Sequence, residues 1–171
     1  MSTPSPERTA RLGASAIAAV WLLVAGALYL GFDYFEQRQQ ARLQPYALST
    51  GELVIARQRD GHFHVVGEVN GQPVKFLVDT GASHVSISQA LAEKAGLPPG
   101  SPITLNTANG QRPGQLVRGV PVRAGHLAFN QASVTVGLVG LPPEQALLGQ
   151  SFLKHFDLEI GRDAMVLRPR P

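Results

Sequence analysis

The tripeptide Asp79-Thr80-Gly81 stands directly after Pro73 to Val78, a mostly apolar run typical of a strand. A carboxylate in this position can simply accept hydrogen bonds from its own turn. It can also do acid–base chemistry if a second carboxylate comes close enough to share one proton with it. Two such carboxylates cannot both ionise, so they titrate as a unit, and one can activate water while the other acts as an acid.

Two further features lie downstream of Asp79. Leu147, Leu148 and Gly149 form an apolar pair followed by a glycine that opens a predicted helical turn, and we expect both leucines to lie in the core. Between the two motifs, Asn109-Gly110 predicts the tip of a hairpin, because both residue types tolerate the positive φ that tight turns need.

Together these features resemble the retroviral-type (retropepsin-like) aspartic proteases, most closely the bacterial, membrane-anchored, single-domain members. The resemblance covers about Gly51 to Val166. It implies an all-β fold, in which a closed β-barrel lobe carries one or two short helices. It also implies an enzyme that hydrolyses polypeptides and uses no metal or organic cofactor. It also implies that Asp79 is the catalytic aspartate.

The resemblance assigns roles to the residues around Asp79. Gly81 presents its N–H to the carboxylate, Thr80 hydrogen-bonds across a dimer axis, and Ala82 and Ser83 leave room for a peptide, with Ser83 also supporting the loop. Leu147, Leu148 and Gly149 pack beneath this loop. The hairpin at Asn109 and Gly110 takes the place of the substrate-covering flap, although it lacks an aromatic residue near its tip.

The chain supplies only one such aspartate. The other aspartates are each followed by a residue other than threonine, and they are Asp33, Asp60, Asp157 and Asp163. The second carboxylate must therefore come from another copy of the chain across a two-fold axis, which predicts a homodimer. The alternative is a catalytically silent, membrane-tethered peptide-binding or assembly module with the same fold.

The N-terminal region carries an uncharged run, Leu12 to Phe32, long enough as a helix to cross a membrane. Arg8 and Arg11 precede the run and acidic residues follow it, which favours an N-terminus inside the cell. A cleaved signal peptide is the alternative, since Ala25-Gly26-Ala27 resembles a cleavage site, but the apolar run continues beyond it. We expect a single-pass protein of the bacterial inner membrane with its enzymatic domain on the periplasmic side.

Composition narrows the remaining functions. The chain has 171 residues, a net charge of +3 and no cysteine, which excludes disulfides and thiolate chemistry and gives little support to nucleic-acid binding. His62 and His64 alternate on one predicted strand and could bind a metal, but no third ligand is apparent. We therefore expect them to lie on a solvated face.

The pattern of apolar residues predicts an organisation of a tail (1–11), an anchor (12–32), a stalk (33–50) that is helical up to Pro45, and one domain (51–171). Within the domain the predicted helix is 89–96, and 146–156 is predicted to be partly helical. The predicted strands are 52–57, 62–69, 73–78, 84–88, 103–107, 115–118, 119–123, 126–129, 132–139, 158–160 and 165–167.

Overall fold

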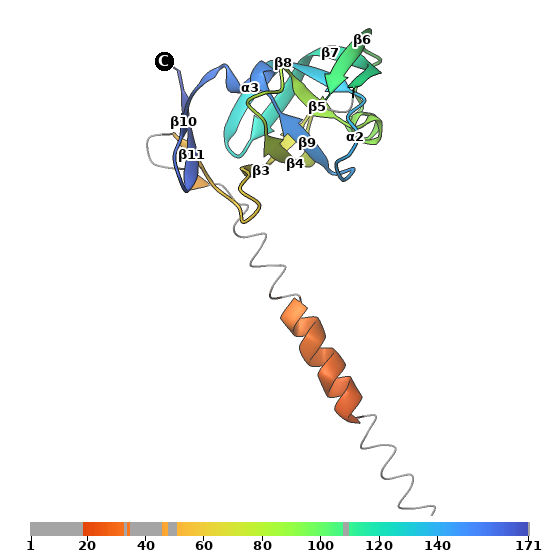
Figure 1. Ribbon diagram of the computed structural model, residues 1–171, viewed down its shortest axis with the longest axis vertical. Coiled ribbons are helices and arrows are strands. Elements are labelled where there is room, and N and C mark those ends of the chain that lie inside the picture. Colours follow the sequence, from red (N-terminus) through yellow and green to blue (C-terminus); the bar gives the residue numbers. More distant parts are fainter. Residues whose placement is uncertain (1–18, 33, 35–45, 48–50, 108–109, 171) are drawn as a thin grey trace, which may run out of the picture. The chain divides into compact units, whose positions relative to one another are not determined.

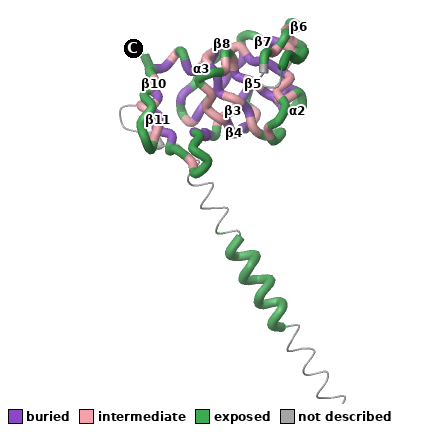
Figure 2. Tube along the Cα trace, in the orientation of Figure 1, coloured by how far each residue is buried: buried purple, intermediate pink, exposed green. Residues whose placement is uncertain are grey.

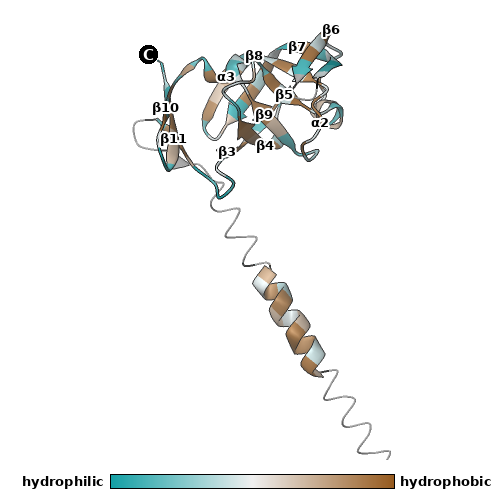
Figure 3. Cartoon of the chain, viewed as in Figure 1, coloured by the Kyte–Doolittle hydropathy of each residue, from teal (hydrophilic) through white to brown (hydrophobic). Residues whose placement is uncertain are grey.

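The computed structural model describes residues 19–32, 34, 46–47, 51–107 and 110–170. The chain divides into two compact units, Met1–Ala41 and Arg42–Pro171. In the first unit, residues 19–32 form a helix whose side chains are exposed and mostly apolar (Figure 3). Among the described residues, no helix combines the length and the hydropathy that crossing a membrane requires. The predicted span 12–32 begins outside the described residues, so the anchor stays a prediction.

The second unit consists mainly of strands (Figure 1). Its described residues form two short helices, α2 (Gln89–Lys94) and α3 (Gln150–Leu153). The strands are β1 (Tyr46–Ala47), β2 (Leu53–Ala56), β3 (His64–Val69), β4 (Gln72–Val78), β5 (Val85–Ile87), β6 (Ser101–Thr107), β7 (Gly110–Ala124), β8 (Leu127–Val136), β9 (Gln145–Leu148), β10 (Phe156–Ile160) and β11 (Ala164–Pro169).

Six of these strands close into a barrel, in the order β3-β4-β9-β5-β8-β7, because β7 pairs back onto β3. The pairs β4–β9 and β5–β8 are parallel, whereas the other pairs are antiparallel. Closure depends on Gly67, which pairs with Ala124: a Cβ atom there would lie 2.9 Å from Phe76 Cε2 and would collide with the carbonyl of Arg123. The predicted closed, all-β fold is therefore confirmed.

A smaller antiparallel sheet, in the order β1-β2-β11-β10, accompanies the barrel. Arg57, just after β2, ties β2 to the β10–β11 turn by donating from Nε to Arg162 O (2.7 Å) and from Nη2 to Gly161 O (3.1 Å). Strand β1 lies within the segment predicted as a stalk, and apart from Tyr34, which is helical, the preceding part of that stalk lies outside the described residues.

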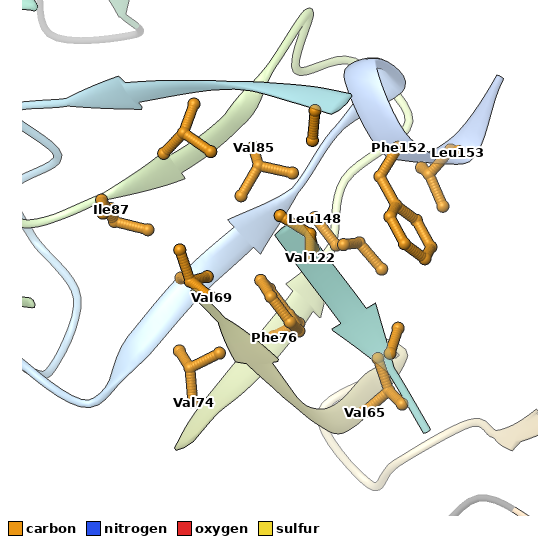
Figure 4. Close-up of a cluster of buried hydrophobic side chains, with 14 of the residues drawn as sticks. Val65, Val69, Val74, Phe76, Val85, Ile87, Val122, Leu148, Phe152 and Leu153 are labelled. Carbon is orange, nitrogen blue, oxygen red and sulfur yellow. The ribbon is translucent and has the colours of Figure 1, made fainter. Parts of the chain in front are cut away.

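Branched and aromatic side chains from alternate positions of the strands fill the barrel interior (Figure 4). The buried positions lie along the strands of the barrel (Figure 2). The largest fully buried side chains include Phe76 from β4, Ile87 from β5, Leu148 from β9 and Phe152 from α3. This alternation places the neighbouring residues of each strand on the outer face of the barrel. Because Phe76 and Leu148 are packed in the core, β4 and β9 are held in place. Asp79 follows directly after β4, so its position is fixed by this packing.

Local sequence signals predicted some of these elements correctly and others only in part. The Asn70-Gly71 turn between β3 and β4 is confirmed, with φ values of 49° and 80°. In contrast, 115–118 and 119–123 belong to one strand, β7, interrupted by register shifts between Val117 and Val122. Likewise, 126–129 and 132–139 were predicted as two strands, whereas β8 runs without a break from Leu127 to Val136.

Candidate active site

Asp79 follows the last residue of β4 and is held from both sides. On one side, the N–H of Val78 donates to Phe63 O (2.9 Å). On the other, the N–H of Asp79 donates to Leu148 O (3.1 Å), which continues the parallel pairing of β4 with β9 beyond Val78 and Leu148. Asp79 is half-buried, and Thr80 and Gly81 are exposed. The carboxylate is thus carried by the barrel wall but stays accessible from outside.

The turn after Asp79 fixes its side chain. The N–H of Gly81 donates to Asp79 Oδ1 (2.9 Å), the contact expected from the sequence, and the N–H of Ala82 donates to Asp79 O (3.3 Å). A Cβ atom on residue 81 would lie 3.3 Å from Asp79 Oδ1, so the approach is already close without one. The turn therefore holds one carboxylate oxygen by a backbone donor.

Residues after β9 form a floor beneath residues 79–84, the Asp79 loop. Gly149 is buried against this loop, because a Cβ atom there would lie 2.6 Å from Ala82 O and 2.7 Å from the carbonyl carbon of His84. Gln150 then donates twice to the loop, from its backbone N–H to Ala82 O (2.8 Å) and from Nε2 to Thr80 O (3.0 Å). The Leu147-Leu148-Gly149 motif therefore contacts the loop as expected, and Gln150 adds a support that the sequence did not reveal.

Ser151 is a second supporting residue that the sequence did not reveal. Its buried Oγ accepts the N–H of Val85 (2.9 Å) and donates to Ser133 O (2.7 Å), so it joins α3 to β5 and β8. A buried hydroxyl with both roles satisfied is a specific structural link, since leaving either backbone group unpaired is costly. The available signal was a serine directly before the apolar pair Phe152-Leu153 in the segment 146–156.

The remaining predicted site residues have mixed outcomes. Leu148 is fully buried, but Leu147, on the other face of β9, is only half-buried, so the prediction that both lie in the core is wrong for Leu147. Both belong to a strand, and the helical turn starts only after Gly149.

Ser83 is exposed, and within the described part of the chain its side chain makes no hydrogen bond. Asn109 lies outside the described residues, whereas Gly110 begins β7 with φ 100° and pairs with Thr107.

The expectation of a solvated pair of histidines is wrong for His64. His62 is exposed, but His64 is buried and bonds through Nε2 to Asp60 Oδ2 (2.9 Å). The N–H of His62 also donates to Asp60, and this bond, followed by the bond to His64, lowers the pKa of the Asp60 carboxyl. Among the described residues, no three His, Cys, Asp or Glu side chains are grouped so that they could hold a metal ion.

Comparison with known proteins identifies the family. The model of a family described as "gag-polyprotein putative aspartyl protease" matches residues 65–155, a little over half of the chain, including the Asp79 loop and its floor. The chain belongs to the retropepsin-like aspartic proteases. It resembles the crystal structure of a retropepsin-like aspartic protease from Rickettsia conorii, with 36% identity and a TM-score of 0.58, over 68% of this chain and 89% of that one.

Two curated relatives extend the similarity beyond the protease domain. An uncharacterised Sinorhizobium protein is 33% identical over 88% of this chain and 71% of its own length. An uncharacterised protein of Rickettsia prowazekii is 31% identical over 87% of this chain and 69% of its own length. Together with the structure, these matches show a retropepsin-like fold and support a peptidase.

Proposed function

We propose that the protein is an aspartic endopeptidase that acts as a homodimer, with one Asp79 from each chain in a shared active site. The observation that carries the proposal is the Asp79 loop itself: an accessible carboxylate held by the N–H of Gly81 at the end of a barrel strand. The sequence has one Asp-Thr-Gly motif, and a proton-sharing pair needs two carboxylates. Two-fold symmetry supplies the second from an identical loop.

The proposed reaction uses the two carboxylates and one water. The ionised Asp79 takes a proton from the water, whose oxygen attacks the carbonyl carbon of the scissile peptide bond. The protonated Asp79 of the other chain gives its proton to the carbonyl oxygen, which forms a tetrahedral diol. The diol collapses as a proton passes to the amide nitrogen, the C–N bond breaks, and the pair is left with one proton.

Substrate recognition is proposed to use the hairpin formed by β6 and β7. This hairpin extends the barrel sheet at its edge, because β7 is the one described strand with which β6 pairs. A peptide lying between the hairpin and the Asp79 loop in an extended conformation would form strand-like backbone hydrogen bonds, which depend little on its sequence. Specificity must then come from side chains on the hairpin and around the loop.

Membrane anchoring through residues 12–32 is part of the proposal. Its support is the uncharged sequence of this segment and the exposed, apolar side chains on the described helix 19–32, such as Trp21, Leu22 and Leu23. So many exposed apolar side chains on one helix are unfavourable in water and favourable in a bilayer. The same proposal places the protease domain outside the cytoplasm.

The deciding experiment is digestion of a peptide library by the purified chain. Asp79→Asn keeps the shape of the side chain and removes its acid–base function, so it should abolish all cleavage. Asp163→Asn is the matched control, because it removes an exposed carboxylate at the β10–β11 turn and should cleave like the wild type. A chain that binds peptides but cleaves none, with or without Asp79, would instead be a silent binding module.

A further inference from the structure

The hairpin of β6 and β7 has one face turned toward the barrel. Leu105 on β6 pairs directly with Arg112 on β7, and residues paired in this way project from the same face. Leu105 identifies where that face points. Its side chain packs on Gly114, where a Cβ atom would lie 2.6 Å from Leu105 Cδ1, and a Cβ atom at Gly137 would lie 3.4 Å from the same atom. The face that carries Leu105 and Arg112 is therefore turned toward Gly137.

Gly137 belongs to a segment, residues 137–144, that joins β8 to β9. It is attached to the end of β5, since the N–H groups of Gly137 (3.0 Å) and Leu138 (2.9 Å) both donate to Ile87 O. β5 follows the Asp79 loop directly, and the 137–144 segment leads into β9, whose Leu148 holds Asp79. The hairpin face with Leu105 and Arg112 thus faces the segment that joins β8 to β9, the strand whose Leu148 holds Asp79.

Arg112 is the only charged residue between Ser101 and Val117. Its side chain is exposed, and within the described residues its guanidinium has no ion pair or hydrogen bond. Three other arginines of this domain are neutralised by carboxylates: Arg123 by Glu68, Arg168 by Glu52 and Glu159, and Arg170 by Asp157. The one carboxylate of the 137–144 segment, Glu144, lies beside the start of the β4–β9 pairing, at the end of β9 away from Leu148.

We propose that Arg112 is a specificity-determining residue that selects peptides with an acidic side chain near the scissile bond. A guanidinium presents a planar set of donors that matches a carboxylate. The Arg112 guanidinium has no partner among the described residues, so all of these donors can bind a substrate carboxylate. The inference rests on the proposed protease function. In a two-fold symmetric dimer each hairpin carries one Arg112, so the preference should occur at two positions, one on each side of the scissile bond.

The test uses peptides with one cleavable core in which each flanking position in turn carries Glu, Gln or Lys. At a pH of about 6, where glutamate is ionised, the wild type should cleave the Glu peptide about fivefold faster than the Lys peptide at the selected positions, the upper range for an exposed ion pair. Arg112→Gln should bring this ratio close to one, and Arg112→Glu should invert it. At a pH of about 3.5 the wild type should cleave the Glu peptide no faster than the Gln peptide, because glutamate is then largely neutral.

Arg118→Glu is the matched control. Arg118 is also exposed and without a partner among the described residues, and it lies further along the same strand, so its reversal changes the net charge equally. It should leave the Glu-to-Lys ratio unchanged. The inference would be overturned by a Glu-to-Lys cleavage ratio that does not respond to Arg112→Glu, or that responds equally to Arg118→Glu. In either case, cleavage of the Gln peptides would still support the protease function. Absence of any Asp79-dependent cleavage would instead overturn the proposed function, and this inference with it.

Discussion

Replacing Gly149 by alanine tests whether the floor beneath the Asp79 loop positions the carboxylate. The backbone of Gly149 is extended, with φ −100° and ψ −171°, so alanine adds no conformational strain. The added Cβ atom, however, would lie 2.6 Å from Ala82 O and would approach His84 O more closely still. Non-bonded carbon and oxygen atoms rarely come within about 3 Å of each other. The Asp79 loop must therefore move away from α3 by about half an ångström or more.

The expected cost has two parts. Adding a methyl group to a filled site costs about 1–3 kcal/mol, which for a domain of this size lowers Tm by about 10 °C. The displaced backbone also carries the bonds from Gln150 to Ala82 and Thr80, so Asp79 moves relative to its partner. A misplacement on the order of 1 Å can reduce kcat/KM about a hundredfold.

The measurements are thermal unfolding by circular dichroism and hydrolysis of one cleavable peptide. Gly161→Ala is the control: this glycine lies on an exposed turn, its φ is not in the left-handed region, and its nearest contact would be Ala164 O at 3.1 Å. It should change Tm by only a few degrees and leave kcat/KM unchanged. A Gly149→Ala chain with wild-type Tm and kcat/KM would refute the assignment of this floor.

Three further outcomes are expected. Ser151→Ala should lower the free energy of unfolding by about 1–3 kcal/mol, seen as a lower Tm, because the N–H of Val85 and the carbonyl of Ser133 lose their buried partner; an unchanged Tm would contradict this link. Burial, reinforced by Lys154 and Arg170, lowers the pKa of His155, so the unfolded chain binds the proton more tightly and stability should fall as pH drops below about 6.5. His155→Phe keeps an aromatic ring at the position stacked on Phe129 and should reduce this pH dependence of Tm. Equal slopes of Tm against pH in the wild type and the variant would exclude His155 as the cause. A reporter active only in the cytoplasm, fused to Pro171, should give no signal, and a strong signal would reverse the proposed topology.

Features set by neighbouring residues could be predicted from the sequence. The Asn70-Gly71 turn follows from residues that tolerate positive φ, and strand β4 with its terminal carboxylate follows from alternation and turn residues. The bond from the N–H of Gly81 to Asp79 is also local, because the two residues belong to one turn. These predictions needed no knowledge of which strands pair.

Features set by distant residues could not be predicted in the same way. Leu147 and Leu148 form a strand because β4 and β5 lie on either side of them, and no signal within 146–156 records those neighbours. The burial of His64 depends on its place in β3 and on its bond to Asp60. The alternation of histidines in the sequence does not show this contact and therefore predicts an exposed side chain. The apparent break in β7 at Arg118-Gly119 is a bulge within one strand, since β8 continues to pair on both sides of it.

The claim that two chains share one active site is tested most directly by mixing subunits. Wild-type chain and an equal amount of Asp79→Asn chain, allowed to exchange, should form dimers in binomial proportions, of which a quarter contain two intact aspartates. Because the number of dimers doubles, activity should fall to about half of that given by the same amount of wild type alone, and a large excess of the variant should reduce it much further. Activity that stays unchanged, with exchange between chains confirmed, would contradict a shared site and leave Asp79 without its partner.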